Sequence, residues 1–190
     1  MIVAPDALFP TDNDLGIPLL TIAEQADFVD LPVRAWGSIS RKSSMRGTWH
    51  FYTGQDRFSA LWKHPEAMQK TRAVTSVEPG FYLDDDMSIA VGAYRIYQKR
   101  WVARYWQEMG TRVFADLTVP EKFQKLNLMG LPDGWRSVAI DCDGDLGLLQ
   151  SRIDFAQDFA RIERLRVLVF GKDEETRELC GKQDWVFVEK

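Results

Sequence analysis

The fold is decided by residues 112–141, which read RVFADLTVPEKFQKLNLMGLPDGWRSVAID. The first part, Arg112–Val119, is rich in β-branched and aromatic residues, which predicts a strand. Pro120 then suits the first turn of a short helix, and Gly130 suits its end. Ser137–Asp141 returns to the strand pattern. A strand, a helix and a strand in this order predict two parallel strands joined by a crossover helix.

The same alternation continues on both sides of this stretch. Four further runs have strand character: Thr48–Tyr52, Ala73–Val77, Arg166–Phe170 and Trp185–Val188. Three segments have helical character: Met87–Met109, a segment that begins near Asp145, and Asp173–Gly181. On the longest of these helices, four apolar side chains are expected to pack against the sheet: Ile89, Ala93, Ile96 and Val102.

This order of elements predicts an α/β domain with a mainly parallel sheet of five or six strands and covering helices. Six strands and roughly 140 residues fall short of a complete eight-stranded barrel, so we expect an open sheet or a partial barrel. Residues 1–33 contain four prolines and lack periodicity, which predicts an extended N-terminal arm laid over the body. Residues 34–190 are expected to form a single domain.

Composition is that of an ordinary globular protein. The 190 residues include 24 Lys and Arg against 28 Asp and Glu, a net charge of −4 at pH 7. No apolar run approaches the ~20 residues that span a bilayer, and residues 1–6 lack the basic start and apolar stretch of a secretion signal. Cys142 and Cys180 are too few for a four-ligand zinc site and are expected to be free thiols. These features favour a cytoplasmic protein with no membrane partner.

Acidic residues fall where predicted strands end. Glu78 follows the second strand, Asp116 lies within the third and Asp141 ends the fourth. Because the carboxyl ends of parallel strands meet at one edge of a sheet, these three are candidate catalytic residues of a hydrolase. A divalent ion would be the cofactor of such a rim, although no residue is assigned as its ligand, and no nucleotide-binding fingerprint is present. The alternative is structural, because acids also stabilise turns and helix starts. His50, inside the first strand, is open to both interpretations.

Basic and aromatic residues support a second hypothesis. The segment 34–47 holds four basic residues and no acid, and the long helix carries cations interleaved with Tyr and Trp. Cations attract phosphates and aromatic faces stack on unpaired bases. We therefore expect contact with DNA or RNA through five residues: Arg41, Lys42, Arg46, Arg95 and Arg100. Against this, charged residues also cover the solvated face of ordinary helices, and most nucleic-acid modules are clearly basic.

A third hypothesis is a non-catalytic protein that binds a host protein. Tryptophan is a common anchor of protein interfaces. Trp36, Trp135 and Trp185 lie in or near predicted loops and strand ends, where they are candidates for this role.

Three stretches also share an order and spacing with a known family. They are Gly47–Tyr52 with Asp56-Arg57-Phe58, Arg95-Ile96-Tyr97 with Arg100-Trp101, and Phe123 with Gly130-Leu131-Pro132. Over residues 36–131 the chain resembles an uncharacterised domain family found mainly in bacteriophage and other mobile-element genomes. The resemblance implies an α/β fold and a mobile-element origin, and it carries no established activity. Since mobile elements commonly handle DNA, nucleic-acid contact ranks first, the carboxylate hydrolase second and host-protein binding third.

Overall fold

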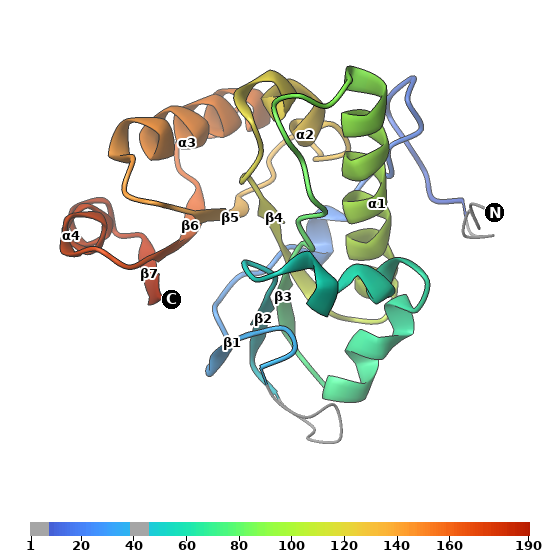
Figure 1. The fold of residues 1–190 in the computed structure, drawn as a ribbon, viewed down its shortest axis with the longest axis horizontal. Helices are drawn as coiled ribbons and strands as arrows, with labels where there is room; N and C mark the ends of the chain where they lie inside the picture. Colours follow the sequence, from blue (N-terminus) through green and yellow to red (C-terminus); the bar gives the residue numbers. More distant parts are fainter. Residues whose placement is uncertain (1–7, 39–45) are drawn as a thin grey trace.

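The computed structural model describes residues 8–38 and 46–190. Within these residues the centre is a seven-stranded sheet whose strands follow one another in chain order (Figure 1). Its strands are β1 (Val33–Ala35), β2 (Thr48–His50), β3 (Thr75–Val77), β4 (Arg112–Asp116), β5 (Ser137–Asp141), β6 (Arg166–Gly171) and β7 (Val186–Glu189). Every neighbouring pair is parallel, which confirms the predicted α/β class and parallel sheet.

The strand count of five or six was wrong because it left out β1. This strand has three residues and pairs in register with β2, from Val33 opposite Thr48 to Ala35 opposite His50. Three residues are too few to show an alternating pattern, so the sequence did not predict this strand. β1 forms because each of its three residues has a partner in register on β2.

The sheet curls almost into a barrel. The ring centroids of His50 on β2 and Phe170 on β6 lie 4.5 Å apart. In a flat sheet, four strand spacings would separate β2 from β6 by about 19 Å. Only a curled sheet brings these rings into contact, so the partial barrel is the correct one of the two predicted forms.

Alternate residues of each strand face the inside and the outside of this barrel. Six buried residues fill the inside: Ala26, Val77, Phe114, Ala139, Leu168 and Phe170. Their neighbours along β4, β5 and β6 face outward and pack under the helices: Val113, Ala115, Val138, Ile140, Val167 and Val169. Burial on both faces explains why these strands are nearly continuous apolar runs.

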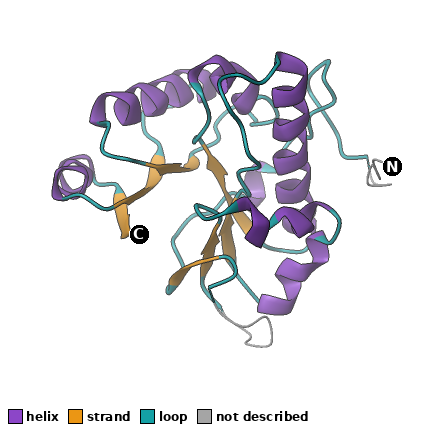
Figure 2. Ribbon diagram, viewed as in Figure 1, coloured by secondary structure: helices purple, strands orange, loops and turns teal. Residues whose placement is uncertain are grey.

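Helices cover the outside of the sheet (Figure 2). The α-helices are α1 (Ile89–Glu108), α2 (Gln124–Leu128), α3 (Leu146–Ala160) and α4 (Glu174–Gln183). Short 3₁₀ helices are η1 (Ile22–Glu24), η2 (Gln55–Arg57), η3 (Ser59–Trp62), η4 (Pro65–Thr71) and η5 (Glu121–Phe123). The predicted start of α3 is confirmed, since Asp145 caps it by accepting a hydrogen bond from the Leu148 N–H. Among the described helices, none has the length and apolarity to cross a bilayer.

Helix α1 buries only part of its expected face. Ile96 and Val102 are fully buried, as predicted, and Ala93 is half-buried. The prediction for Ile89 was wrong, because its side chain is 55% exposed. Ile89 is the first residue of α1, and the helix makes its close contact one turn later, where Gly92 lies against the ring of Phe123.

An aromatic cluster fills the space between α1 and the segment from β2 to η3. Its buried aromatic members are Trp36, Trp49, Phe51, Phe58, Phe81, Trp101 and Trp106. Trp36 is 5% exposed and Trp135, in another cluster, is 1% exposed. The expectation that these two tryptophans anchor a host protein was therefore wrong, because both are core residues.

The segment before β1 lies along the body of the domain. The Leu20 N–H donates to the Gly130 carbonyl at 2.8 Å, and the Ala26 N–H donates to the Val113 carbonyl at 3.0 Å. Leu20 packs in the outer core, and Ala26 closes the inside of the barrel at the amino ends of the strands.

Candidate functional site

Asp116 is the centre of a buried polar cluster at the carboxyl end of β4, and its side chain is 1% exposed. Its Oδ1 accepts hydrogen bonds from the Tyr52 hydroxyl at 2.9 Å and from the Thr118 backbone N–H at 2.8 Å. Its Oδ2 accepts from the ammonium of Lys99 at 3.0 Å. Both oxygens are thus satisfied by groups inside the protein.

Glu78, which follows β3, is fully buried beside Asp116. Its Oε1 accepts from Nη1 of Arg100 at 2.5 Å, and its Oε2 accepts from the Asp116 backbone N–H at 3.0 Å. The Lys99 ammonium lies 4.0 Å from the same Oε2. Two carboxylates and two cations balance in this space, as burial of charge requires.

Consecutive residues of α1 supply both cations, because this helix connects β3 to β4 and covers them. Lys99 also donates to the Asp116 carbonyl at 2.9 Å. Arg100 also donates to the carbonyls of Asn127 at 2.5 Å and Met129 at 3.2 Å. Burial lowers the pKa of Arg100, and the charge of Glu78 acts against this shift. The cluster thereby fastens α1 to two strands and to the end of α2.

Asp141, at the end of β5, differs from the other two predicted carboxylates because solvent reaches it. Its side chain is 19% exposed and forms an ion pair with Lys190, whose ammonium also lies 3.2 Å from Oδ1 of Asp143. Burial raises the pKa of Asp141, while its hydrogen bond with Lys190 acts in the opposite direction. An accessible carboxylate with increased proton affinity is suited to general acid–base chemistry.

His50 and Tyr52 lie at the same end of the barrel. His50 is 8% exposed, and burial, followed by the charge of Lys190, lowers its pKa to about 4. The imidazole is therefore neutral at pH 7, and its Nδ1 has no hydrogen-bond partner among the described residues. Burial is also the largest cause of the raised pKa of Tyr52, followed by the charge of Asp116.

The three predicted carboxylates come to one end of the sheet, but they do not form a metal site. Among the described residues, no group of three or more His, Cys, Asp and Glu side chains is placed to hold a metal ion. Lys99 contacts both Glu78 and Asp116, so a positive charge already lies between these two carboxylates. The residues present do not fit the divalent ion that the hydrolase hypothesis allowed.

Of the five predicted nucleic-acid residues, the three that the structure describes do not form one surface. Arg41 and Lys42 lie outside the described residues, and Arg46 is exposed. Arg95 is half-buried and donates to Oε1 of Gln98 at 3.0 Å. The prediction for Arg100 was wrong, because its buried guanidinium cannot reach a phosphate.

Sequence reasoning missed a larger group of exposed cations in the segment that runs from β1 to the start of β3, whose backbone lies in the lower part of Figure 1. Residues 34–72 contain eight basic and two acidic residues, opposite in sign to the whole chain. Six exposed cations of this segment form no ion pair with another described residue: Arg34, Arg46, Arg57, Lys63, Lys70 and Arg72. A running count of charge over this length of sequence would have revealed the segment.

Two relationships connect these cations in space. Arg46 and Arg72 precede β2 and β3, which are neighbours in the sheet, so both lie at the amino ends of these strands. Arg57 and Lys70 line one hollow of about 160 Å³, together with His64. Each of these two pairs of cations therefore lies on one local part of the domain.

A comparison with known protein families matches residues 9–179 to DUF4417, described as a domain of unknown function. The match includes Glu78, Asp116, Asp141 and the basic segment 34–72, and it ends before β7 and Lys190. Comparisons with curated proteins and with solved structures give no match.

Proposed function

Because the chain belongs to the DUF4417 family of domains of unknown function, we propose its function from its own residues: contact with nucleic acid through the exposed cations of residues 34–72. One observation carries the proposal. Six exposed cations of this segment have no acidic partner among the described residues. Elsewhere many cations are paired, including Arg104, Arg112 and Arg177. Exposed cations without an acidic partner in the protein are available to pair with an external anion.

Phosphates are the anions that such a surface fits. Each Lys or Arg that neutralises a phosphate releases condensed counterions, and a duplex loses affinity with a slope of about −0.9 per contact in log K against log salt. The acidic remainder of the chain repels the backbone and would orient the domain with residues 34–72 toward it. A mobile-element origin, implied by the resemblance over residues 36–131, is part of this proposal, because handling DNA is a common task there.

The proposed surface changes the set of residues expected from the sequence. Arg46 stays in it, and Arg41 and Lys42 stay as predictions because they belong to the same basic segment. Arg57 and Lys70 enter because they line the same hollow. Arg95 is expected to contribute less to binding, since its guanidinium already donates a hydrogen bond to Gln98.

The test compares two double charge reversals that change the net charge equally. Arg57→Glu with Lys70→Glu alters the proposed surface, and Lys172→Glu with Lys182→Glu alters exposed positions near α4. Fluorescence anisotropy with labelled single- and double-stranded DNA at low salt measures the affinity. We expect the first pair to lose at least tenfold in affinity and to show a shallower salt slope, and the control pair to change little. The proposal would be contradicted if no binding were detected with about tens of micromolar protein. Equal losses of affinity in the two double variants would also contradict it.

The carboxyl end of the barrel supports a second function, hydrolysis by general acid–base chemistry. The observation that favours it is Asp141, an accessible carboxylate with a raised pKa beside Lys190. Glu78 and Asp116 are buried and ion-paired, so they would position the site rather than touch a substrate. The same DNA probes test this function: cleavage that disappears in Asp141→Asn, with an unchanged melting temperature, is the expected result. An intact probe after long incubation with the unmodified protein would contradict hydrolysis of DNA.

A further inference from the structure

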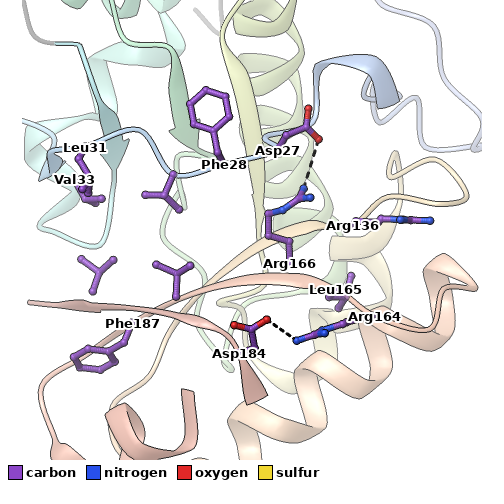
Figure 3. A pocket seen from close by; sticks show the side chains of 13 residues that line it. Asp27, Phe28, Leu31, Val33, Arg136, Arg164, Leu165, Arg166, Asp184 and Phe187 are labelled. Atoms are coloured by element: carbon purple, nitrogen blue, oxygen red, sulfur yellow. Dashed lines mark hydrogen bonds and ion pairs between the residues drawn. The ribbon is translucent and has the colours of Figure 1, made fainter. Parts of the chain in front are cut away.

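A cavity of about 670 Å³ lies between β1 and β7, the two edges of the curled sheet (Figure 3). β1 pairs with β2 and β7 pairs with β6, and neither has a second partner strand in the described residues. The cavity is therefore the place where an eighth strand would close the barrel.

The backbone groups that face the cavity can be identified from the hydrogen bonds on the other side. On β7, the Lys190 N–H donates to the Gly171 carbonyl of β6. Since backbone groups of successive residues alternate in direction, Phe187, which lines the cavity, presents its backbone groups away from β6 and toward the cavity. The same argument applies to β1, where the Trp36 N–H donates to the His50 carbonyl of β2, so that Val33 faces the cavity. Both edges carry donors and acceptors without a strand to pair with.

The cavity also has an exposed apolar lining. Phe28, Leu31 and Val186 line it and are 46%, 76% and 42% exposed. Figure 3 shows Leu31 and Val33 on one side of the space and β7 on the other. Contiguous exposed apolar side chains between polar groups are typical of an interaction site.

One end of the cavity is positively charged. Arg164 and Arg166 lie there, but they are paired with Asp184 at 2.8 Å and with Asp27 at 3.6 Å. Arg136 is exposed, lines the same cavity and forms no ion pair with a described residue. It leaves one uncompensated positive charge at the amino ends of the strands.

We propose that this cavity binds an extended peptide segment of another protein, which takes the place of the missing strand. Alternate apolar side chains of the peptide pack on the lining, its backbone pairs with the free edges, and an acidic side chain at one end meets Arg136. A small amphipathic acid would use the lining and the arginine but would leave both edges unpaired. The two free edges are the reason for choosing a peptide.

The probe is a fluorescein-labelled peptide of one glutamate followed by alternating valine and threonine, and anisotropy measures its binding. Val186→Lys places a charge in the cavity, and Val91→Lys is the matched control, because Val91 is 44% exposed on α1. We expect Val186→Lys and Arg136→Glu to weaken binding at least tenfold and Val91→Lys to leave it unchanged. Circular dichroism melting confirms that the variants fold.

Two modified peptides test the mode of binding. N-methylation at alternate residues removes backbone donors but keeps the side chains, and we expect it to abolish binding. Lysine in place of the glutamate should weaken binding, because it would face Arg136. Equal binding of the N-methylated peptide, or displacement of the peptide by decanoate alone, would overturn the proposal in favour of a small-molecule site. No binding at millimolar peptide, or a dimer that Val186→Lys disrupts, would also overturn it.

Discussion

The ammonium of Lys99 lies 3.0 Å from Oδ2 of Asp116, and both side chains are 1% exposed. The same ammonium is 4.0 Å from Glu78, whose other oxygen is held by Arg100. One lysine on α1 therefore compensates two carboxylates that end neighbouring strands, and it connects the helix layer to the polar end of the barrel.

Replacing Lys99 by methionine should destabilise the fold strongly. Lys99→Met keeps the length of the side chain, but it leaves only Arg100 to compensate the two negative charges of Asp116 and Glu78. Loss of one partner from a buried ion pair costs about 3–5 kcal/mol in the free energy of unfolding. Urea denaturation measures the loss. Lys125→Met, at an exposed position, is the control and should change stability by less than about 0.5 kcal/mol. Similar effects of the two substitutions would contradict the buried pairing.

Stability should depend on His50 in the weakly acidic range. The pKa of His50 is lowered to about 4 from its ordinary value of 6.5, so the unfolded chain binds this proton more tightly. The contribution is fully present above pH 6.5 and is lost as the pH falls toward 4, by about 3 kcal/mol in total. The measurement is the free energy of unfolding against pH for the unmodified protein and for His50→Gln. The variant should show a smaller loss between pH 6.5 and 4, and identical slopes would show that His50 is not buried in its neutral form.

Two glycines should respond in opposite ways to alanine. A Cβ at Gly92 on α1 would lie 2.1 Å from the ring of Phe123, so Gly92→Ala should destabilise by about 1–3 kcal/mol through overpacking. A Cβ at Gly181 on α4 would meet nothing within 4 Å, and Gly181→Ala should stabilise by roughly 0.5–1 kcal/mol through helix propensity. Thermal melts of both variants measure the difference, and a stabilising Gly92→Ala would exclude the close contact with Phe123.

Neither cysteine should react in the folded protein. Cys142 and Cys180 are free and buried, which confirms the expected thiols. Burial is the largest cause of the pKa of Cys180 being raised to about 11, so little thiolate exists at pH 8. A colourimetric thiol reagent should titrate no group quickly in native buffer and two groups in guanidinium chloride. Fast labelling of either thiol in native buffer would contradict its burial.

Sequence patterns predicted most strands because a buried strand is recognised from neighbouring residues alone, as an apolar run between Gly, Pro and polar residues. They also placed Glu78, Asp116 and Asp141 at one edge, since parallel strands end together. They did not predict that Lys99 and Arg100 neutralise the first two. Helix α1 carries polar residues all round, so its pattern does not tell which face meets the sheet. That choice depends on packing against Phe123 and the aromatic cluster, which residues distant in the chain supply.

The order of the strands has a consequence for biosynthesis. Because each strand pairs with the one that precedes it in the chain, a growing polypeptide can add every new strand to an edge that already exists. Each addition still has to close the crossover that joins the two strands, and these crossovers are long, as between Val77 and Arg112, which slows folding. The contact between His50 and Phe170 joins β2 to β6, so the curl is completed only when the sixth strand has left the ribosome. Until then, the inner faces of the early strands stay exposed to water and to chaperones.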